Sequence, residues 1–157
     1  MRTAAAALTT AGLVTAAQLG LAGAASAAAE ATAPASAGCP LDLVYPSRFS
    51  VDSHGWVTNG GLYFGIRNKS TAKSFSKVTF TVTDVRNIRF GAATPAGGKV
   101  THKTSKTVSV YASALGRKAG LGVKVRTHLL DFRSYRVKFT LHGSGWTCAV
   151  NQGTWGA

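Results

Sequence analysis

Apolar and polar residues alternate without a break in Lys77-Val78-Thr79-Phe80-Thr81-Val82-Thr83. Successive side chains on a β-strand point to opposite faces, so Val78, Phe80 and Val82 share one face and the threonines share the other. This pattern predicts a strand with one buried face and one solvated face, which is typical of antiparallel sheets. Valine, phenylalanine and threonine also favour strands intrinsically.

The same alternation continues outward along the chain. Two later segments, 121–129 and 135–141, each carry one apolar face. Shorter strands are predicted at 41–45, 62–68, 87–90, 107–111 and 146–150. Turns rich in Gly, Asn and Pro separate these segments, and no helical apolar stripe is present beyond the N-terminal region. About seven or eight such strands predict an all-β fold, an antiparallel β-sandwich.

The N-terminal region differs from the rest in composition. Arg2 precedes an uncharged run from Thr3 to Ala29, which has an apolar centre and the small-residue sequence Ala25-Ser26-Ala27 near its end. These features predict a secretory signal peptide over residues 1–27. The alternative is an uncleaved membrane anchor, because the uncharged run is long enough to span a bilayer.

Three segments follow the signal peptide. Residues 28–38 are small and contain proline, which predicts a flexible lead-in. Residues 39–150 hold the alternating pattern and predict one β-sandwich domain. Residues 151–157 are expected to form a Gly-rich tail. We expect no transmembrane span after signal cleavage, and we expect a secreted protein that is either extracellular or associated with the cell wall.

The two cysteines, Cys39 and Cys148, mark the two ends of the predicted domain. An exported chain meets an oxidising environment, where two cysteines allow one intramolecular bridge. We therefore expect a disulfide that joins the ends of the domain and stabilises it by about 4–5 kcal/mol. The alternative is a reactive thiol, which the apolar neighbours of Cys148 disfavour.

Two stretches combine a strand with a characteristic turn. In the first, the strand 62–68 ends in the turn Asn68-Lys69-Ser70, and the next strand ends in Asp84. In the second, Leu115 to Gly120 precedes a strand. These stretches resemble bacterial secreted immunoglobulin-like domains of actinobacterial type. The resemblance implies an immunoglobulin-like sandwich but no activity, because this architecture hosts many functions.

Basic residues far outnumber acidic ones, with 18 Lys plus Arg against five Asp plus Glu and a formal net charge of +13. The shortage of carboxylates argues against two-metal hydrolysis and against an EF-hand calcium site. An excess this one-sided is typical of proteins that bind an anionic polymer. The alternative is a solvated surface that maintains solubility and discourages strand edges from pairing.

The late strands suggest where this charge gathers. We expect 121–129 and 134–142 to pair as a hairpin with both apolar faces inward, which places Arg126 opposite Lys138. The candidate polyanion-binding residues on this sheet face are Lys124, Arg126, His128, Arg136 and Lys138. Candidate stacking residues are Trp56 and Trp155. Wall teichoic acid, acidic polysaccharide, extracellular DNA and anionic lipid are the expected partners.

No catalytic constellation stands out. Asp52, Ser53 and His54 are adjacent in sequence, whereas the members of a catalytic triad come from separate elements. The remaining histidines lack zinc-ligand spacing, so we expect no metal and no cofactor. We expect a non-catalytic binding protein. One alternative is an inhibitor or toxin-like protein that uses the loops 91–106 and 116–120, and another is a small basic hydrolase or nuclease.

Overall fold

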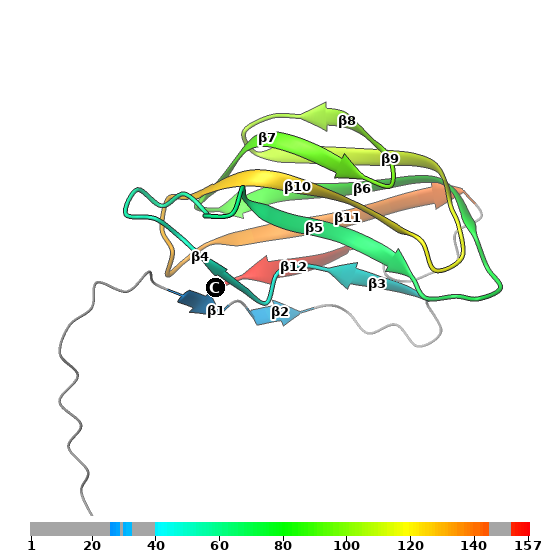
Figure 1. Cartoon of the computed structure of the whole chain (residues 1–157), viewed down its shortest axis with the longest axis horizontal. Helices are drawn as coiled ribbons and strands as arrows, with labels where there is room; N and C mark the ends of the chain where they lie inside the picture. The colour runs from blue at the N-terminus through cyan, green and yellow to red at the C-terminus, as the bar shows by residue number, and fades with distance from the viewer. Residues whose placement is uncertain (1–25, 29, 33–39, 145–151) are drawn as a thin grey trace, which may run out of the picture.

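The computed structural model describes residues 26–28, 30–32, 40–144 and 152–157 (Figure 1). These residues form strands joined by turns and loops, and they contain no helix. Ten of the strands make two antiparallel sheets that enclose one apolar core. The prediction of an all-β fold with two antiparallel sheets is therefore confirmed.

The smaller sheet has four strands in the order β3-β5-β10-β7. Their bounds are Leu41–Val44 for β3, Leu62–Asn68 for β5, Gly120–Leu129 for β10 and Ile88–Ala96 for β7. Strand β10 lies in the interior of this sheet and pairs with β5 on one side and β7 on the other. Every second residue of β10 therefore points outward from the sandwich.

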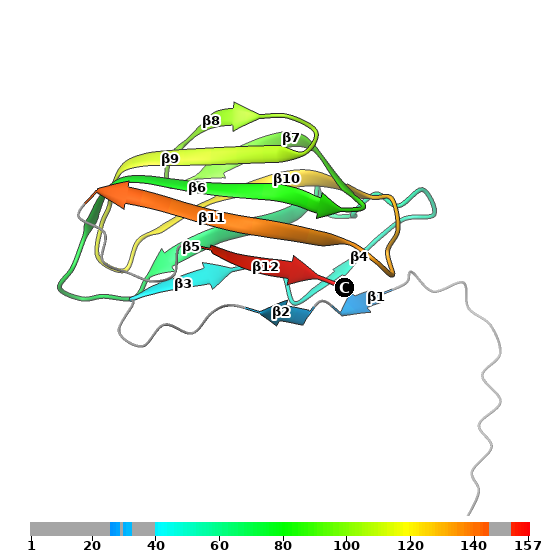
Figure 2. The same ribbon diagram turned by 180° about the vertical axis from the view of Figure 1, so that it is seen from behind.

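The larger sheet has six strands in the order β2-β12-β11-β6-β9-β8 (Figure 2). Their bounds are Glu30–Thr32 for β2, Gln152–Gly156 for β12, Arg136–Ser144 for β11, Phe75–Arg86 for β6, Thr107–Leu115 for β9 and Lys99–Lys103 for β8. Two short strands, β1 (Ser26–Ala28) and β4 (Arg48–Ser50), pair separately.

Strand β6 lies in the interior of the larger sheet and contains the alternating segment 77–83. Val78, Phe80 and Val82 are completely buried, while the intervening threonines are half-buried on the outer face. Burying a side chain of this kind contributes about 1.5–3 kcal/mol. The predicted division of this strand into a buried and a solvated face is confirmed.

Trp155 is a large component of the core. Its exposed fraction is 1%, its ring centroid lies 5.3 Å from that of Phe64, and its indole N–H donates to the Pro46 carbonyl at 3.0 Å. The ring therefore has no face available to a ligand, which corrects its prediction as a stacking residue. Residues 152–156, expected in a tail, form β12.

Strands β10 and β11 belong to different sheets, so the expected hairpin is wrong. The connection 130–135 crosses from the four-stranded sheet to the six-stranded sheet. Arg126 faces a bulge of β7, whereas Lys138 has Thr83 and Thr154 as its partners. Both strands still direct their apolar residues into the same core, because the core lies between the sheets.

Several sequence predictions fall on other parts of the chain. Cys39, Cys148 and the predicted strand 146–150 lie outside the described residues, so the disulfide stays a prediction. The signal peptide and its cleavage also stay predictions, because residues 1–25 lie outside the described residues. Residues 30–32, within the expected lead-in, form β2 and pair with β12.

Candidate anion-binding face

The structure divides the five predicted basic site residues between two surfaces. Lys124, Arg126 and His128 lie on the outer face of the four-stranded sheet, because all three point outward from β10. Arg136 and Lys138 point outward from β11, on the outer face of the other sheet. The single basic face expected from the sequence is therefore corrected to two, and the β10 set also meets Trp56.

The loop between β4 and β5 brings Trp56 to this face. In the residues that precede β5, the Val57 N–H donates to the Thr127 carbonyl at 2.9 Å. The Leu129 N–H donates to the Gly55 carbonyl at 2.8 Å. These bonds extend the pairing along β10 and place Trp56 opposite His128. Two residues far apart in sequence thus become cross-strand neighbours.

Trp56 contacts two side chains of β10, the His128 ring and the Arg126 guanidinium. The Trp56 and His128 ring centroids lie 4.7 Å apart with an interplanar angle of 20°, and the Arg126 guanidinium carbon lies 4.3 Å from the Trp56 ring centroid. A cation–π contact such as that of Arg126 contributes about 0.5–1 kcal/mol at an exposed site. The indole, predicted as a stacking residue for ligands, is stacked within the protein and orients Arg126 and His128.

A hydrogen bond defines the tautomer of His128. Its Nε2 lies 2.9 Å from the His54 carbonyl oxygen. A carbonyl oxygen only accepts, so Nε2 carries the hydrogen and donates it, which fixes the orientation of the ring beside Trp56.

Gly55 permits this close approach. Its φ is +82°, and a Cβ there would lie 2.4 Å from the Leu129 carbonyl oxygen and 3.3 Å from the His128 ring. A side chain at this position would disrupt the backbone pairing that sets Trp56 against His128. Glycine is thus required by both the backbone conformation and the available space.

The Asp52-Ser53-His54 sequence forms a turn. The Asp52 carboxylate accepts the backbone N–H groups of His54 and Trp56, both at 2.9 Å. The bond from Trp56 is the main cause that lowers the pKa of Asp52, and nearby His54 and His128 act in the same direction. The Ser53 hydroxyl bonds the His54 ring at 3.3 Å. Asp52 therefore stabilises the loop that carries Trp56.

The rest of this surface follows β10. Tyr63 lies opposite Lys124, and its ring lies so close to Gly122 that a Cβ there would be 2.4 Å from the hydroxyl oxygen. Burial raises the pKa of Tyr63, so the phenol stays neutral. From Gly122 to His128 the strand extends roughly 20 Å. We define the β10 face as Trp56, Tyr63, Lys124, Arg126 and His128.

The acidic side chains of the domain form bonds of their own, and Asp52 does so directly beside the β10 face. Within the described residues two ion pairs form, Lys69 with Asp42 and Arg89 with Asp84. Asp52 accepts from its own turn, and Asp131 likewise accepts the Arg133 N–H at 2.8 Å. No described carboxylate forms an ion pair with a cation of the β10 face. Lys124 and Arg126 are therefore not neutralised by a described ion pair.

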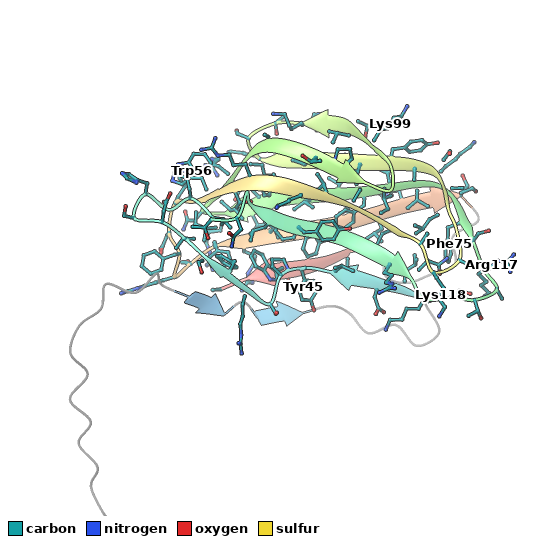
Figure 3. All side chains as sticks on the ribbon, viewed as in Figure 1. Tyr45, Trp56, Phe75, Lys99, Arg117 and Lys118 are labelled. Carbon is teal, nitrogen blue, oxygen red and sulfur yellow. The ribbon has the colours of Figure 1, made fainter. Side chains whose placement is uncertain are left out.

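The segments expected as presenting loops have different structures. Most of 91–106 forms β7 and β8, joined by Gly97 and Gly98. A shallow hollow of about 330 Å³ lies beside this turn, with the Lys99 ammonium 5.9 Å from the Tyr111 ring centroid. Residues 116–119 form a true turn that exposes Arg117 and Lys118, at the opposite end of the molecule from Trp56 (Figure 3).

Comparison with known proteins gives no relative from which a function could be transferred. No protein-family model matches the chain, and no curated protein matches it. Among the residues that the structure describes, no three His, Cys, Asp or Glu side chains gather as a metal site would require. The same residues include no helix long and apolar enough to cross a bilayer.

Proposed function

We propose that this protein is secreted and binds an anionic polymer, without catalysis, on the β10 face. The observation that carries the proposal is the stack of Arg126 and His128 on Trp56, on a surface whose cations have no described carboxylate partner. A guanidinium already held in place loses less conformational entropy when it binds an anion. The stack therefore favours Arg126 as the principal ligand contact.

The ligand chemistry follows from the donors. A guanidinium forms paired hydrogen bonds with phosphate or carboxylate, and Lys124 adds a point charge beside it. A length of roughly 20 Å accommodates several charged units of a chain. Wall teichoic acid, acidic polysaccharide and extracellular DNA all supply such repeated anions. Binding to any of them should weaken steeply as salt rises, because counterion release drives it.

A retention experiment on immobilised anionic polymers, across a salt series, tests this site. The substitution Arg126→Glu should weaken binding about tenfold, because it removes the oriented guanidinium and adds a repulsive charge. Lys138→Glu on the other sheet and Arg117→Glu at the far end are matched charge reversals and should have much smaller effects. Equal losses in all three variants would show that net charge alone causes retention, and would refute the β10 site.

We further propose that the sandwich is immunoglobulin-like and that Cys39 pairs with Cys148. The strand-and-turn stretches that resemble secreted actinobacterial domains support the first point. The position of the cysteines at the two ends of the predicted domain supports the second. Peptide mapping without reductant should recover one cross-linked peptide pair. Recovery of both cysteines as free thiols from the protein outside the cell would contradict the pairing.

A further inference from the structure

Three large apolar side chains are exposed at one end of the molecule. Leu130 and Phe132, in the connection between β10 and β11, are 51% and 43% exposed, and Val85 near the end of β6 is 56% exposed. They are the large apolar residues most exposed among those described. The Leu130 N–H donates to the Asn87 carbonyl at 2.8 Å, which joins the two segments. Exposed apolar residues gathered in one place indicate an interaction surface.

The connection that presents Leu130 and Phe132 has a defined conformation. The neighbouring residues Leu129 and Tyr135 are buried, so both ends of the connection are anchored in the core. The Asn87 side-chain amide donates to the Ser134 carbonyl at 2.7 Å, and Asp131 accepts the Arg133 N–H. The backbone is thus held by specific bonds while its apolar side chains project into solvent.

One arginine contacts these apolar side chains, and two more lie close to them along the chain or in strand register. The Arg133 guanidinium lies 5.6 Å from the Phe132 ring centroid, and Arg86 is adjacent to Val85 in sequence. Arg136 lies opposite Arg86 in the sheet. The Arg86 guanidinium donates to the Ala157 carbonyl at 3.0 Å, so Arg133 and Arg136 are the cations left for an outside partner, and Asp131 is the carboxylate within the connection. We define this surface as the apolar tip: Val85, Leu130 and Phe132, with Arg86, Arg133 and Arg136.

We infer that the apolar tip docks on the surface of an anionic phospholipid bilayer. Leu130 and Phe132 would enter the boundary between headgroups and acyl chains, while the arginines remain at the level of the phosphates. Each basic residue near such a surface adds favourable electrostatic energy. A second copy of this chain is disfavoured as the occupant, because two molecules that each carry a formal charge of +13 repel one another. Projecting loop residues also suit a bilayer better than the broad packed patch of a protein interface.

This inference goes beyond the proposed polymer-binding function and uses a different set of residues. The β10 face binds through oriented charge, whereas the apolar tip requires both charge and apolar contact. Soluble polyanions offer no acyl chains, so loss of the apolar side chains should leave polymer retention unchanged. The two surfaces can therefore be tested separately in the same protein.

Vesicle co-sedimentation tests the apolar tip. The protein released by the expressing cell, with its N-terminus determined by mass spectrometry, is mixed with vesicles of phosphatidylcholine alone or with phosphatidylglycerol. The double substitution Leu130→Ser and Phe132→Ser should weaken binding to the anionic vesicles about tenfold. The conservative pair Leu130→Met and Phe132→Leu, which preserves apolar surface, should retain binding. All variants are compared in protein with the same N-terminus, so a difference in vesicle binding comes from the substituted residues of the apolar tip.

A spectroscopic variant reports insertion directly. In Phe132→Trp, the added indole should shift its emission to shorter wavelength when anionic vesicles are added, beyond any change in the wild type. Each of three results would overturn the inference: no binding of the wild type to anionic vesicles, unchanged binding after the serine substitutions, or equal binding to neutral vesicles. Loss of vesicle binding with polymer retention intact supports the tip independently of the β10 face.

Discussion

The two ends of the sandwich both expose cations, but the loops at one end are polar, whereas those at the other end also expose large apolar side chains. At one end, Lys73, Arg117 and Lys118 lie on polar loops that join β5 to β6 and β9 to β10. At the other end, Leu130 and Phe132 are exposed, and Arg133 contacts Phe132. The difference indicates that positive charge is spread over the whole molecule, whereas a surface suited to an amphipathic partner occurs at one end.

An asparagine ties the loops together at each end. Asn68 is completely buried, and its amide group donates to the carbonyls of Lys73 and Gly116 at 2.8 and 2.9 Å, while its oxygen accepts the Ser70 N–H at 3.0 Å. Asn87 is half-buried and donates one such bond, to Ser134. The end with Asn68 is thus closed by a buried polar network, and the end with Asn87 leaves apolar side chains outside.

The largest expected effect concerns this network. Asn68→Ala should lower the free energy of unfolding by about 3 kcal/mol, because it leaves buried carbonyl and N–H groups without partners. Asn87→Gly is the control at the other end and should cost less, since one side-chain bond is lost and glycine suits the φ of +53° at this position. Urea unfolding followed by circular dichroism measures both. Equal losses would mean that the two ends are stabilised alike and would contradict the comparison.

A smaller effect is expected at Gly55. Gly55→Ala should destabilise the domain by about 2 kcal/mol, because φ is positive there and the added Cβ meets the Leu129 carbonyl. It should also weaken polymer binding, since the loop no longer sets Trp56 against His128. Gly116→Ala, where a Cβ meets no atom closer than 4.0 Å, is the control. Retention of full stability and binding in Gly55→Ala would refute this account of the loop.

The smallest effect is a pH dependence of the same loop. Asp52 has a lowered pKa in the folded state, so its contribution to stability is present above its ordinary value of 3.8 and is lost as pH falls through the lowered value. Asp52→Asn removes the titrating group and should flatten this part of the stability profile below pH 3.8. Unfolding measured at acidic and neutral pH compares the variant with the wild type. Parallel profiles would contradict the role given to Asp52.

Alternation was sufficient to predict the long central strands, but it missed β2, β8 and β12 and did not assign strands to sheets. The alternation in 77–83 and in 121–129 predicts which residues of each strand face inward. Those inward residues are buried in the structure. The same side chains are buried whether 130–135 is a hairpin turn within one sheet or a connection between the two sheets. Periodicity therefore could not distinguish these two possibilities. For this reason the basic residues of β10 and β11 were placed on one face instead of two.

Contacts between distant residues were also beyond the sequence. Trp56 and Arg126 were each candidate site residues, but their stacking depends on the extended pairing between the β4–β5 loop and β10. Trp155 stands alone among small residues, and its burial depends on Pro46 and Phe64. The exposed apolar residues were missed, although Leu130 and Phe132, on either side of Asp131 in a polar turn, were a readable signal.

The pairing order of the strands has a consequence for the speed of folding. The pairing of β6 with β11 brings together Arg86 and Arg136, and β5 joins β10 over a similar separation in sequence. Such non-local contacts require large loops to close before they give any stabilisation, and proteins dominated by them fold in milliseconds to seconds. Among the described pairings, β8 with β9 is one of the few between consecutive strands. The chain should therefore remain unfolded long after helical domains of equal length have folded.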